Sequence, residues 1–510
     1  MVSAYGATPG LHLQSAIVIK YCTTIPKNHR RHQSMLKLFA FLLALLISST
    51  VTAQDRLPQG ITTALEKAAI PPNSLSLLVM PIAGGTPVLA HNSELAVSPA
   101  STMKLVTTLI ALEELGPTFR WKTQILSDSA IVRETLRGDL YLRGGGDPNL
   151  TWDKLSMMLR SLRQLGLRKI KGDIILDRSY FQPTRPDLGG APFDETPDAY
   201  YNVIPDALLI HSNLTSIQLE SSASSIATRL LTPLANVKIG NHLRLNNRPC
   251  AEWATDWLPP TLEITKKHEI EISLNGGFSR NCKITTYLNI LDRNTYIASM
   301  IRAFWTELDG SWQGTVQDGI TPAGATLLVE RQSETLADTI RIVNKQSDNG
   351  MARFLYLTLG AESTSVKNYP NHLLAADARI RAWLSRQGIR EDGLVMENGS
   401  GLSRLERISA QQLATLLQAG ARSNWFAEFA SSLPIVALDG TMRKRLKGSA
   451  AEGRARIKTG TLNNAIAVSG YVRDINDAHW IVVGIINIDD ARRGKTVLDE
   501  LIAWVANGRP

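Results

Sequence analysis

The sequence contains few cysteines and no hydrophobic run of membrane-spanning length near its start, and both absences narrow the kinds of protein it can encode. Three cysteines occur in 510 residues, too few for a small scaffold held together by disulfides. The apolar run Leu38–Ile47 is much shorter than the roughly 20 residues needed to span a bilayer. Low-complexity tracts and a C-terminal membrane helix are also absent. We therefore expect a folded chain, with at most peripheral membrane association.

The sequence also lacks a stripe of Lys and Arg interleaved with aromatic residues. Its formal net charge of +9 suggests an acidic partner at first sight, but the first 53 residues hold five of the basic side chains and no Asp or Glu. Without them, 50 basic residues stand against 46 acidic ones, a net charge near +4. The charge pattern therefore gives no reason to expect a nucleic-acid partner.

The N-terminal segment has the pattern of a secretory signal. Basic residues at 27–32 and Lys37 precede the apolar run, and small and polar residues follow it as far as Ala53. Such a pattern predicts export with cleavage after Ala53. A retained membrane anchor is the alternative, which the short apolar run disfavours. Met35 could be the true start, and the sequence leaves that open.

The two cysteines after this segment, Cys250 and Cys282, form an even pair. In an oxidising compartment such a pair is typically a disulfide. Two buried free thiols are the alternative.

The periodicity of the remaining chain predicts an α/β fold interrupted by a β-rich segment. Two strands joined by a Gly-rich turn are expected at 75–80 and 88–91, followed by a helix at 101–115. Between about 121 and 296 the chain changes to short alternating stretches punctuated by Gly, Pro and Asn. Beyond it, helices are expected at 296–308, 336–345, 350–359, 375–384, 410–419 and 495–506, and strands at 465–472 and 480–488.

Three short motifs occur in order along the chain. They are Ser101-Thr102-Met103-Lys104, Ser347-Asp348-Asn349 and Lys458-Thr459-Gly460. Each is weak alone, because chance matches occur at Ser34–Lys37, Ser273–Asn275 and Ser279–Asn281. The setting distinguishes the three: a helix start, a turn between two helices and the edge of a strand.

The first motif predicts an activated serine. Ser101 and Lys104 are one turn apart at the start of a helix, so both side chains face the same way. A neutral Lys104 could deprotonate Ser101, but lysine normally titrates near 10.4. Desolvation or a neighbouring positive charge must lower that pKa, and we expect Lys458 to contribute.

The other two motifs predict groups that handle the substrate. Ser347 can relay a proton to the leaving amine, and Asn349 can hydrogen-bond the substrate's amide backbone, while Asp348 is expected to be structural. Lys458 and Thr459 can hold a terminal carboxylate. The N–H groups of Ser101 and Thr461 can form an oxyanion hole.

Together with Asn398–Arg404 and Asp439–Met442, these motifs make the chain resemble the D-alanyl-D-alanine carboxypeptidase/endopeptidase family, the class C penicillin-binding proteins. The long interval between Ser101 and Ser347 is typical of that family. One departure is Asn398, which stands where the resemblance predicts an Asp.

The resemblance implies a transpeptidase/β-lactamase-like sandwich built from 54–120 and 297–510, with two small β-rich domains inserted at 121–296. It implies an enzyme that cleaves D-Ala-D-Ala ends and cross-links of peptidoglycan through an acyl-enzyme on Ser101, and that penicillins acylate. Gly460 and Arg404 would help to bind substrate, and neither metal nor cofactor is implied.

Two alternatives to this function are a β-lactamase and a non-catalytic binding protein, and other enzyme classes fit less well. A β-lactamase of class A would carry a Glu loop of the E-x-x-L-N type after Asn349, and none follows. A non-catalytic binding protein would be expected to lack a catalytic residue, and none is missing. Zinc-peptidase and P-loop signatures are absent, since Asp489 replaces the glycine that a P-loop ending at Gly494-Lys495-Thr496 requires.

The resemblance also singles out Asp194, in the predicted insert, as a group that meets the free ammonium of a diaminopimelate side chain. A solvated turn residue is the alternative. We expect Asp194→Ala to lower kcat/KM for peptides that carry the free amine, by the ~1–3 kcal/mol of a charge-assisted hydrogen bond. Penicillin acylation and amine-free peptides should be nearly unaffected. Equal losses on both peptide types would mean that Asp194 only supports the fold.

Overall fold

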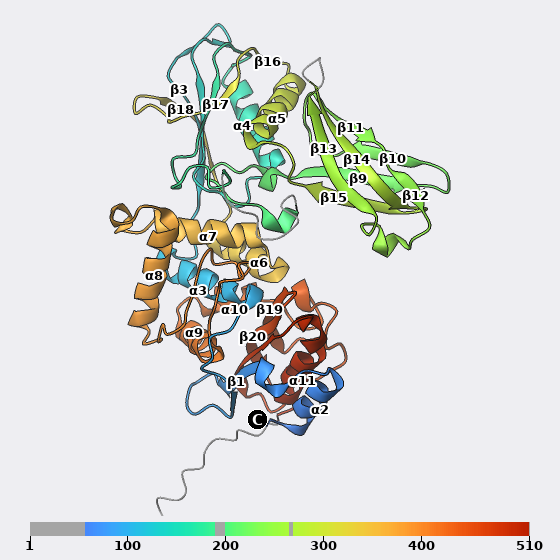
Figure 1. The fold of residues 1–510 in the computed structure, drawn as a ribbon. Helices are drawn as coiled ribbons and strands as arrows, with labels where there is room; N and C mark the ends of the chain where they lie inside the picture. Colours follow the sequence, from blue (N-terminus) through green and yellow to red (C-terminus); the bar gives the residue numbers. More distant parts are fainter. Residues whose placement is uncertain (1–56, 189–198, 265–268, 509–510) are drawn as a thin grey trace, which may run out of the picture. The chain divides into compact units, whose positions relative to one another are not determined.

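The computed structural model describes residues 57–188, 199–264 and 269–508 (Figure 1). Within these ranges, no helix combines the length and the apolar character that crossing a bilayer requires. The elements fall into one central sheet with helices on both faces, and several smaller sheets from the middle of the chain.

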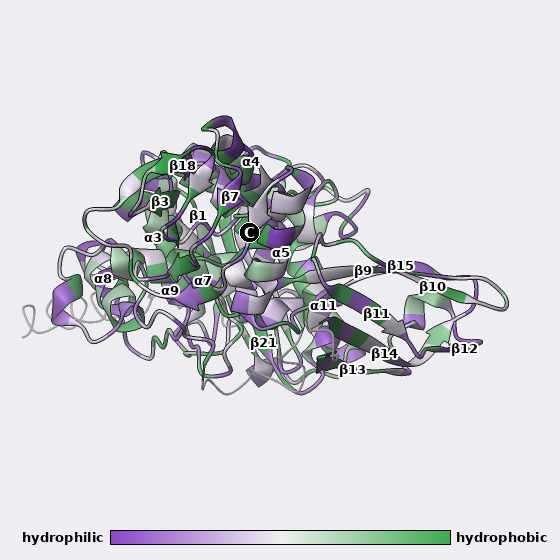
Figure 2. Ribbon diagram, turned by 90° about the horizontal axis from the view of Figure 1, so that it is seen from above, coloured by the Kyte–Doolittle hydropathy of each residue, from purple (hydrophilic) through white to green (hydrophobic). Residues whose placement is uncertain are grey.

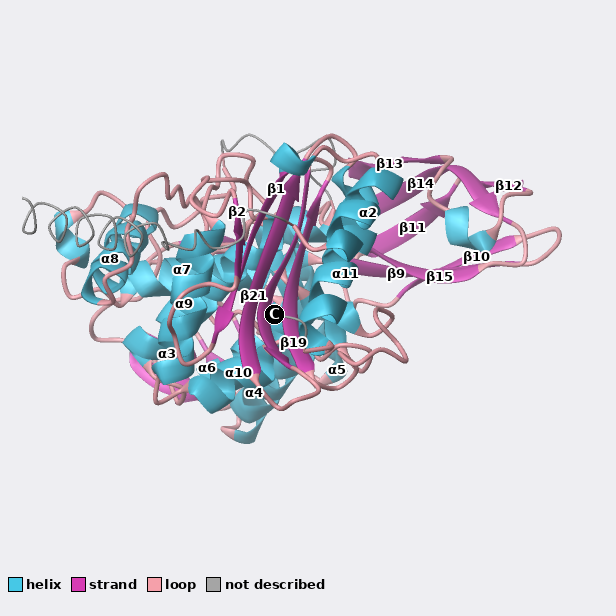
Figure 3. Cartoon of the chain, turned by 90° about the horizontal axis from the view of Figure 1, so that it is seen from below, coloured by secondary structure: helices cyan, strands magenta, loops and turns pink. Residues whose placement is uncertain are grey.

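The central sheet joins the two ends of the described chain. Its five antiparallel strands lie in the order β19 (Ala455–Leu462), β20 (Ala465–Arg473), β21 (His479–Asn487), β1 (Leu75–Pro81) and β2 (Leu89–His91). The expected hairpin is β1 with β2, and the two predicted C-terminal strands are β20 and β21. Figure 3 shows the sheet with helices on either side.

Alternate residues of the inner strands β1, β20 and β21 enter two different cores. On β1, Leu77 and Val79 pack with helices α2 (Gln59–Lys67) and α11 (Lys495–Ala506). Leu78 and Met80 point to the opposite face and join the core of the remaining helices. Because both faces are covered, apolar residues follow one another without interruption from Leu77 to Met80.

The opposite face carries the helix predicted at 101–115 and the helices predicted between 336 and 419, whereas the helix predicted at 495–506 is α11 on the first face. Helix α3 (Lys104–Leu115) lies among them and is buried from Lys104 to Leu112. A helix that is apolar on all sides belongs inside a core. Around it pack α6 (Leu336–Gln346), α7 (Asn349–Ala361), α8 (His372–Arg386), α9 (Ala410–Arg422) and α10 (Phe426–Ser432).

The middle of the chain forms smaller sheets in two groups. The first group has a sheet in the order β17-β8-β6-β3-β18 and a sheet in the order β16-β7-β5-β4. Two helices, α4 (Trp152–Gln164) and α5 (Arg293–Glu307), pack on them. The strands are β3 (Lys122–Ser127), β4 (Ile131–Val132), β5 (Thr135–Leu136), β6 (Leu140–Arg143), β7 (Lys169–Ile170), β8 (Ile174–Asp177), β16 (Ser311–Trp312), β17 (Val316–Asp318) and β18 (Thr326–Gln332).

The second group has a sheet in the order β10-β9-β15 and a four-stranded sheet built around β14. Figure 2 shows hydrophobic and hydrophilic residues mixed along these strands. The predicted β-rich segment is therefore present in the α/β fold. The strands are β9 (Thr215–Ser221), β10 (Ile226–Leu230), β11 (Val237–Asn241), β12 (Arg244–Asn246), β13 (Trp257–Ile264), β14 (Ile270–Ser279) and β15 (Lys283–Leu288).

The helix expected at 296–308 packs differently from the prediction, which placed it in the helical part of the peptidase domain. It is α5, and Tyr296, Met300 and Phe304 contribute to the core of the β-rich segment. Helical periodicity marks a buried face but does not identify its partner. Strand β18 pairs antiparallel with β3, so we propose that the inserted segment extends to about residue 332 rather than 296.

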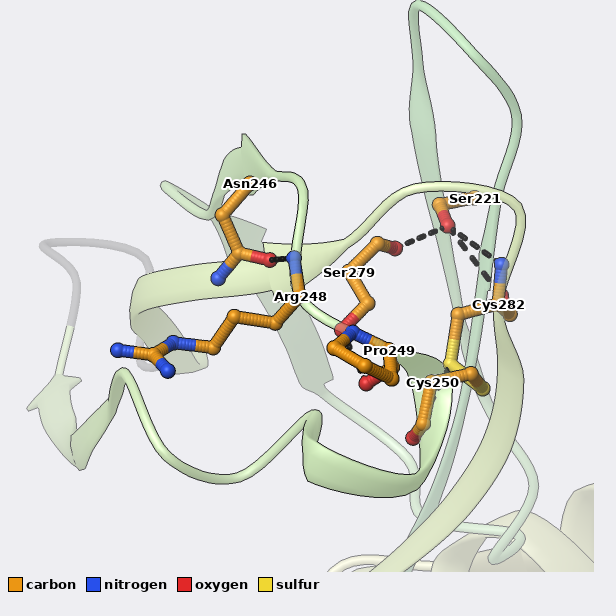
Figure 4. The surroundings of a disulfide bond; sticks show 7 residues. All are labelled: Ser221, Asn246, Arg248, Pro249, Cys250, Ser279 and Cys282. Carbon is orange, nitrogen blue, oxygen red and sulfur yellow. Dashed lines mark hydrogen bonds between the residues drawn. A yellow bond between two sulfur atoms is a disulfide. The ribbon is translucent and has the colours of Figure 1, made fainter.

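Cys250 and Cys282 are bonded to each other in the second β group (Figure 4). The Cys282 N–H donates to the Ser221 hydroxyl at 3.0 Å, and that hydroxyl donates to the Ser279 carbonyl at 2.6 Å. The two cysteines are 32 residues apart in the sequence.

Protein isolated without reductant, from residue 54 onward, should show no thiol that reacts with a dye under denaturing conditions. Reduction should expose two thiols. Closing a loop of this length contributes about 3–4 kcal/mol in the chain-entropy model, so the Cys250→Ser/Cys282→Ser double variant should unfold at lower denaturant concentration. Two reactive thiols before reduction would contradict the pairing.

Candidate active site

Ser101 lies in a tight turn that leads into helix α3. A 3₁₀ turn covers Ala100–Met103, and the α-helix begins at Lys104, so the helix predicted at 101–115 starts one turn earlier in 3₁₀ form. The Thr102 hydroxyl donates to the Pro99 carbonyl at 2.8 Å and fixes the turn. The side chain of Ser101 is partly exposed at a cleft.

Two glycines allow other segments to approach the Ser101 backbone closely. A Cβ added at Gly460 or at Gly401 would lie 2.8 Å from the Ser101 nitrogen. Gly401 also has a φ of +77°, which a residue with a side chain adopts only with strain. The predicted site residue Gly460 therefore lies against the backbone of Ser101.

Lys104 is fully buried directly behind Ser101. Its Nζ lies 2.9 Å from the Ser101 Oγ and donates to the Asn349 Oδ1 at 2.6 Å and to the Ser400 carbonyl. An ammonium group would use all three hydrogens on these acceptors. A neutral amine would donate to two of them and keep its lone pair for the Ser101 hydroxyl.

Burial lowers the pKa of Lys104 to about 7, while the charges of Asp348 and Glu406 oppose that shift. The sequence predicted a lowered pKa but gave part of the cause to Lys458. Burial is the main cause for Lys104. Burial also lowers the pKa of the fully buried Lys458 well below its usual value, and repulsion by Lys104 adds to that shift.

The second motif lies in the turn between α6 and α7, as predicted. Ser347 adopts a left-handed conformation that ends α6, with φ of 61°. Asp348 caps α7 by accepting the Met351 N–H at 2.8 Å, which is the structural part expected of it. The Ser347 hydroxyl accepts a hydrogen bond from Lys458 Nζ at 2.8 Å.

The third motif lies within β19, the strand at one edge of the central sheet. The sequence predicted a strand only after this motif, and the structure adds one that contains it. Thr459 and Thr441 hydroxyls lie 2.7 Å apart. Thr461 is exposed at the cleft.

A cleft of about 740 Å³ brings the three motifs together. Ser101, Ser347, Asn349, Thr459 and Thr461 line it. The predicted substrate-binding residue Arg404 also lines it, and its guanidinium donates to the Leu402 carbonyl at 3.0 Å. Asp194 lies outside the described residues.

The inserted segment supplies one wall of this cleft. Tyr200 and Tyr201 line it, with their rings edge to face at 5.6 Å. The Tyr201 carbonyl accepts from Asn349 Nδ2 at 3.2 Å, and the Val203 carbonyl accepts from Arg353 at 2.9 Å. Helix α7 therefore holds this wall in place by two hydrogen bonds.

Sequence reasoning missed four contributions to the site. Thr441 belongs to a motif that supported the resemblance, but no part was assigned to it. Tyr201 and the Ser400 carbonyl contribute backbone oxygens, which no side-chain pattern can indicate. Glu406 is a buried carboxylate two residues after Arg404, and only its burial in the structure distinguishes it from a surface charge.

Residues 57–508 match the model of the D-Ala-D-Ala carboxypeptidase 3 (S13) family. The chain belongs to this family. The predicted family is thereby confirmed, and it places the chain among the peptidases, a class of hydrolases.

Relatives of this S13 family member cover most of its length. It is 29% identical over 434 residues to the D-alanyl-D-alanine carboxypeptidase of Actinomadura sp. (strain R39), covering 82% of this chain and 78% of the relative. It is 24% identical over 402 residues to the D-alanyl-D-alanine carboxypeptidase DacB of Haemophilus influenzae, covering 78% and 82%.

Solved structures confirm the predicted fold class. Penicillin binding protein 4 (dacB) of Haemophilus influenzae superimposes with a TM-score of 0.72 at 21% identity, covering 89% of this chain and 99% of that one. A second structure of the same protein, complexed with a β-lactam, has a TM-score of 0.68 at 20% identity, covering 87% and 98%.

Within the described ranges, no group of His, Cys, Asp and Glu side chains is placed to hold a metal ion.

Proposed function

We propose that this S13 family member is a serine-type D-Ala-D-Ala carboxypeptidase and DD-endopeptidase that acts on peptidoglycan stem peptides and cross-links. The observation that carries the proposal is the contact between Ser101 Oγ and the buried amine of Lys104, whose pKa burial lowers to about 7. The family and the names of its relatives support the substrate class.

In the proposed acylation, the neutral amine of Lys104 takes the proton of the Ser101 hydroxyl. The Oγ attacks the carbonyl carbon of the penultimate D-Ala, and the oxygen–carbon bond forms while the carbon–nitrogen bond breaks. The proton that Lys104 took is passed through the Ser347 hydroxyl, which accepts a hydrogen bond from Lys458 Nζ at 2.8 Å, to the departing amine. A water molecule then hydrolyses the ester and returns Ser101 to its starting state.

The oxyanion formed in this step would meet the N–H groups of Ser101 and Thr461. The close approach of Gly460 to the Ser101 nitrogen supports this pairing, because it brings β19 against the turn that carries the nucleophile. A larger residue at Gly460 would force the two backbones apart.

Recognition of the free carboxylate is proposed to involve Thr459 and Thr441. Their hydroxyls are hydrogen-bonded to each other, so one proton lies between them and the other remains for the substrate. Lys458 lies behind Thr459, fully buried, and adds a donor on the same strand. Arg404 at the cleft supplies a further cation for the substrate peptide.

The side-chain amide of Asn349 already has a hydrogen-bond partner at each end, which the sequence did not indicate. Its Oδ1 accepts from Lys104, and its Nδ2 donates to the Tyr201 carbonyl. The remaining Nδ2 hydrogen and the second lone pair of Oδ1 are what it can offer a substrate amide. We propose that it both orients Lys104 and binds substrate.

Penicillins are proposed to acylate Ser101 in the same way, which agrees with the β-lactam complex of the Haemophilus influenzae protein. The proposed location is the periplasm, where peptidoglycan is the substrate and Cys250 and Cys282 can remain oxidised.

A fluorescent penicillin should label the purified protein covalently, and Ser101→Ala should abolish the labelling. Ser273→Ala changes the serine of a chance S-x-N match in β14, and it should be labelled like the unchanged protein. Stable labelling indicates slow deacylation, whereas rapid turnover of the antibiotic would indicate a β-lactamase. Undiminished labelling of Ser101→Ala would refute the assignment of the nucleophile.

The rate of acylation should rise with pH and level off above a midpoint near 7, because the neutral form of Lys104 is the base and its pKa is lowered to about 7. A Lys104→Arg side chain keeps its proton at these pH values, so the rate should fall by roughly 10²–10⁴-fold. Stopped-flow fluorescence over pH 5–9 measures both. A rate independent of pH across this range would contradict Lys104 as the base.

A further inference from the structure

The loop 397–401 is held by a single buried carboxylate. Glu406 has no exposed surface. Its Oε1 accepts the backbone N–H groups of Glu397, Asn398 and Gly399 at 3.2, 3.1 and 2.9 Å. Three donors on one oxygen fix the backbone of this loop as a unit.

The same loop contacts the nucleophile and its base. The Ser400 carbonyl accepts from Lys104 Nζ, and the Gly399 carbonyl accepts from the Thr107 hydroxyl of α3 at 2.7 Å. Gly401 lies against the Ser101 backbone. Loop 397–401 therefore lies between Glu406 and the Ser101–Lys104 pair.

A side-chain amide replaces the carboxylate that the resemblance predicts within this loop. Asn398 is neutral, and its Oδ1 accepts from the Ser400 hydroxyl at 2.6 Å. The buried carboxylate at this loop comes instead from Glu406. Both oxygens of this carboxylate are buried, and backbone N–H groups of the loop stabilise its charge.

Charged groups reach Lys104 from three elements. Asp348 faces it from the start of α7, Lys458 faces it from β19, and Glu406 acts on it from behind the loop. The charges of Glu406 and Glu397 also act on the guanidinium of Arg353, on α7. The side chain of Glu397 is exposed. Burial raises the pKa of Glu406, and the loop's N–H groups oppose that shift.

We propose that Glu406 is a positioning residue for the Ser101–Lys104 pair: it holds the Ser400 carbonyl against the Lys104 amine and supplies a negative charge beside it. This inference rests on the proposed function and adds a residue to its machinery.

The geometry explains why such a residue is useful. A neutral amine has two hydrogens, and the Ser400 carbonyl and the Asn349 Oδ1 take both. The lone pair is then directed at the Ser101 hydroxyl. If the carbonyl moves, the lone pair loses its direction, and misplacement of about 1 Å can cost ~10²-fold in rate.

Glu406→Gln keeps an oxygen for the loop's N–H groups and removes only the charge. Without that charge the protonated form of Lys104 is less stable, so the pKa of Lys104 falls further. The acid limb of the pH profile, where the acylation rate rises as Lys104 loses its proton, should therefore move to lower pH by about 0.5–1 unit. Above that limb the rate should stay within about threefold of the unchanged protein. Glu397→Gln removes a charge from an exposed residue of the same loop and should leave the limb where it is.

Glu406→Ala removes the acceptor as well. Its kcat for a D-Ala-D-Ala peptide should fall ~10- to 100-fold with little change in KM, and its Tm reports whether the fold survives. If Glu406→Ala does not fold, the pH profile of Glu406→Gln decides alone.

If the pH midpoint of the acylation rate is the same in Glu406→Gln as in the unchanged protein, the inference is wrong. It is also wrong if Glu397→Gln shifts that midpoint by an equal amount. The proposed function is judged separately, on the unchanged protein. If that protein is not labelled at Ser101, the proposed function fails, whatever the Glu406 variants show.

Discussion

The site depends on one constraint: the amine of Lys104 must be buried away from water and still have hydrogen-bond acceptors. Lys104 has no exposed surface, and a buried amine without partners would be costly. Its partners come from three separate segments: the turn before α3, the start of α7 and the loop 397–401. Each segment must therefore be in place before Lys104 has its lowered pKa.

The fold satisfies this constraint by making α3 the innermost helix. Its residues are buried from Lys104 to Leu112, between the sheet and the surrounding helices. A side-chain amide inside this layer links three helices: Asn344 Nδ2 of α6 donates to the Thr108 hydroxyl of α3 and to the Ser432 hydroxyl of α10. These bonds fix α6 against α3, and Ser347 follows at the end of α6.

The long inserted segment does not separate the two halves of the site, because the chain returns to the point where it left. Strand β18 pairs with β3, and next to them the backbone N–H of Ser333 donates to the Trp121 carbonyl at 2.9 Å. The helices before and after the insertion are thereby held as neighbours. The inserted segment also contacts helix α7, because the backbone carbonyls of Tyr201 and Val203 accept hydrogen bonds from Asn349 and Arg353 of that helix.

The sequence by itself determined the three motifs, their settings and the main elements. Periodicity located α11 at 495–506 and β20 from 465 onward, since an apolar pattern over ten or so residues is a local signal. It also indicated that Lys104 needs a lowered pKa, because the chemistry of a lysine base requires it. Only the tertiary structure decided that burial lowers the pKa of Lys104, and which core α5 joins. It alone brought the backbone carbonyl of Ser400 and the carboxylate of Glu406 to the site. Burial and backbone contacts arise between residues far apart in the chain, and no local pattern of side chains specifies them.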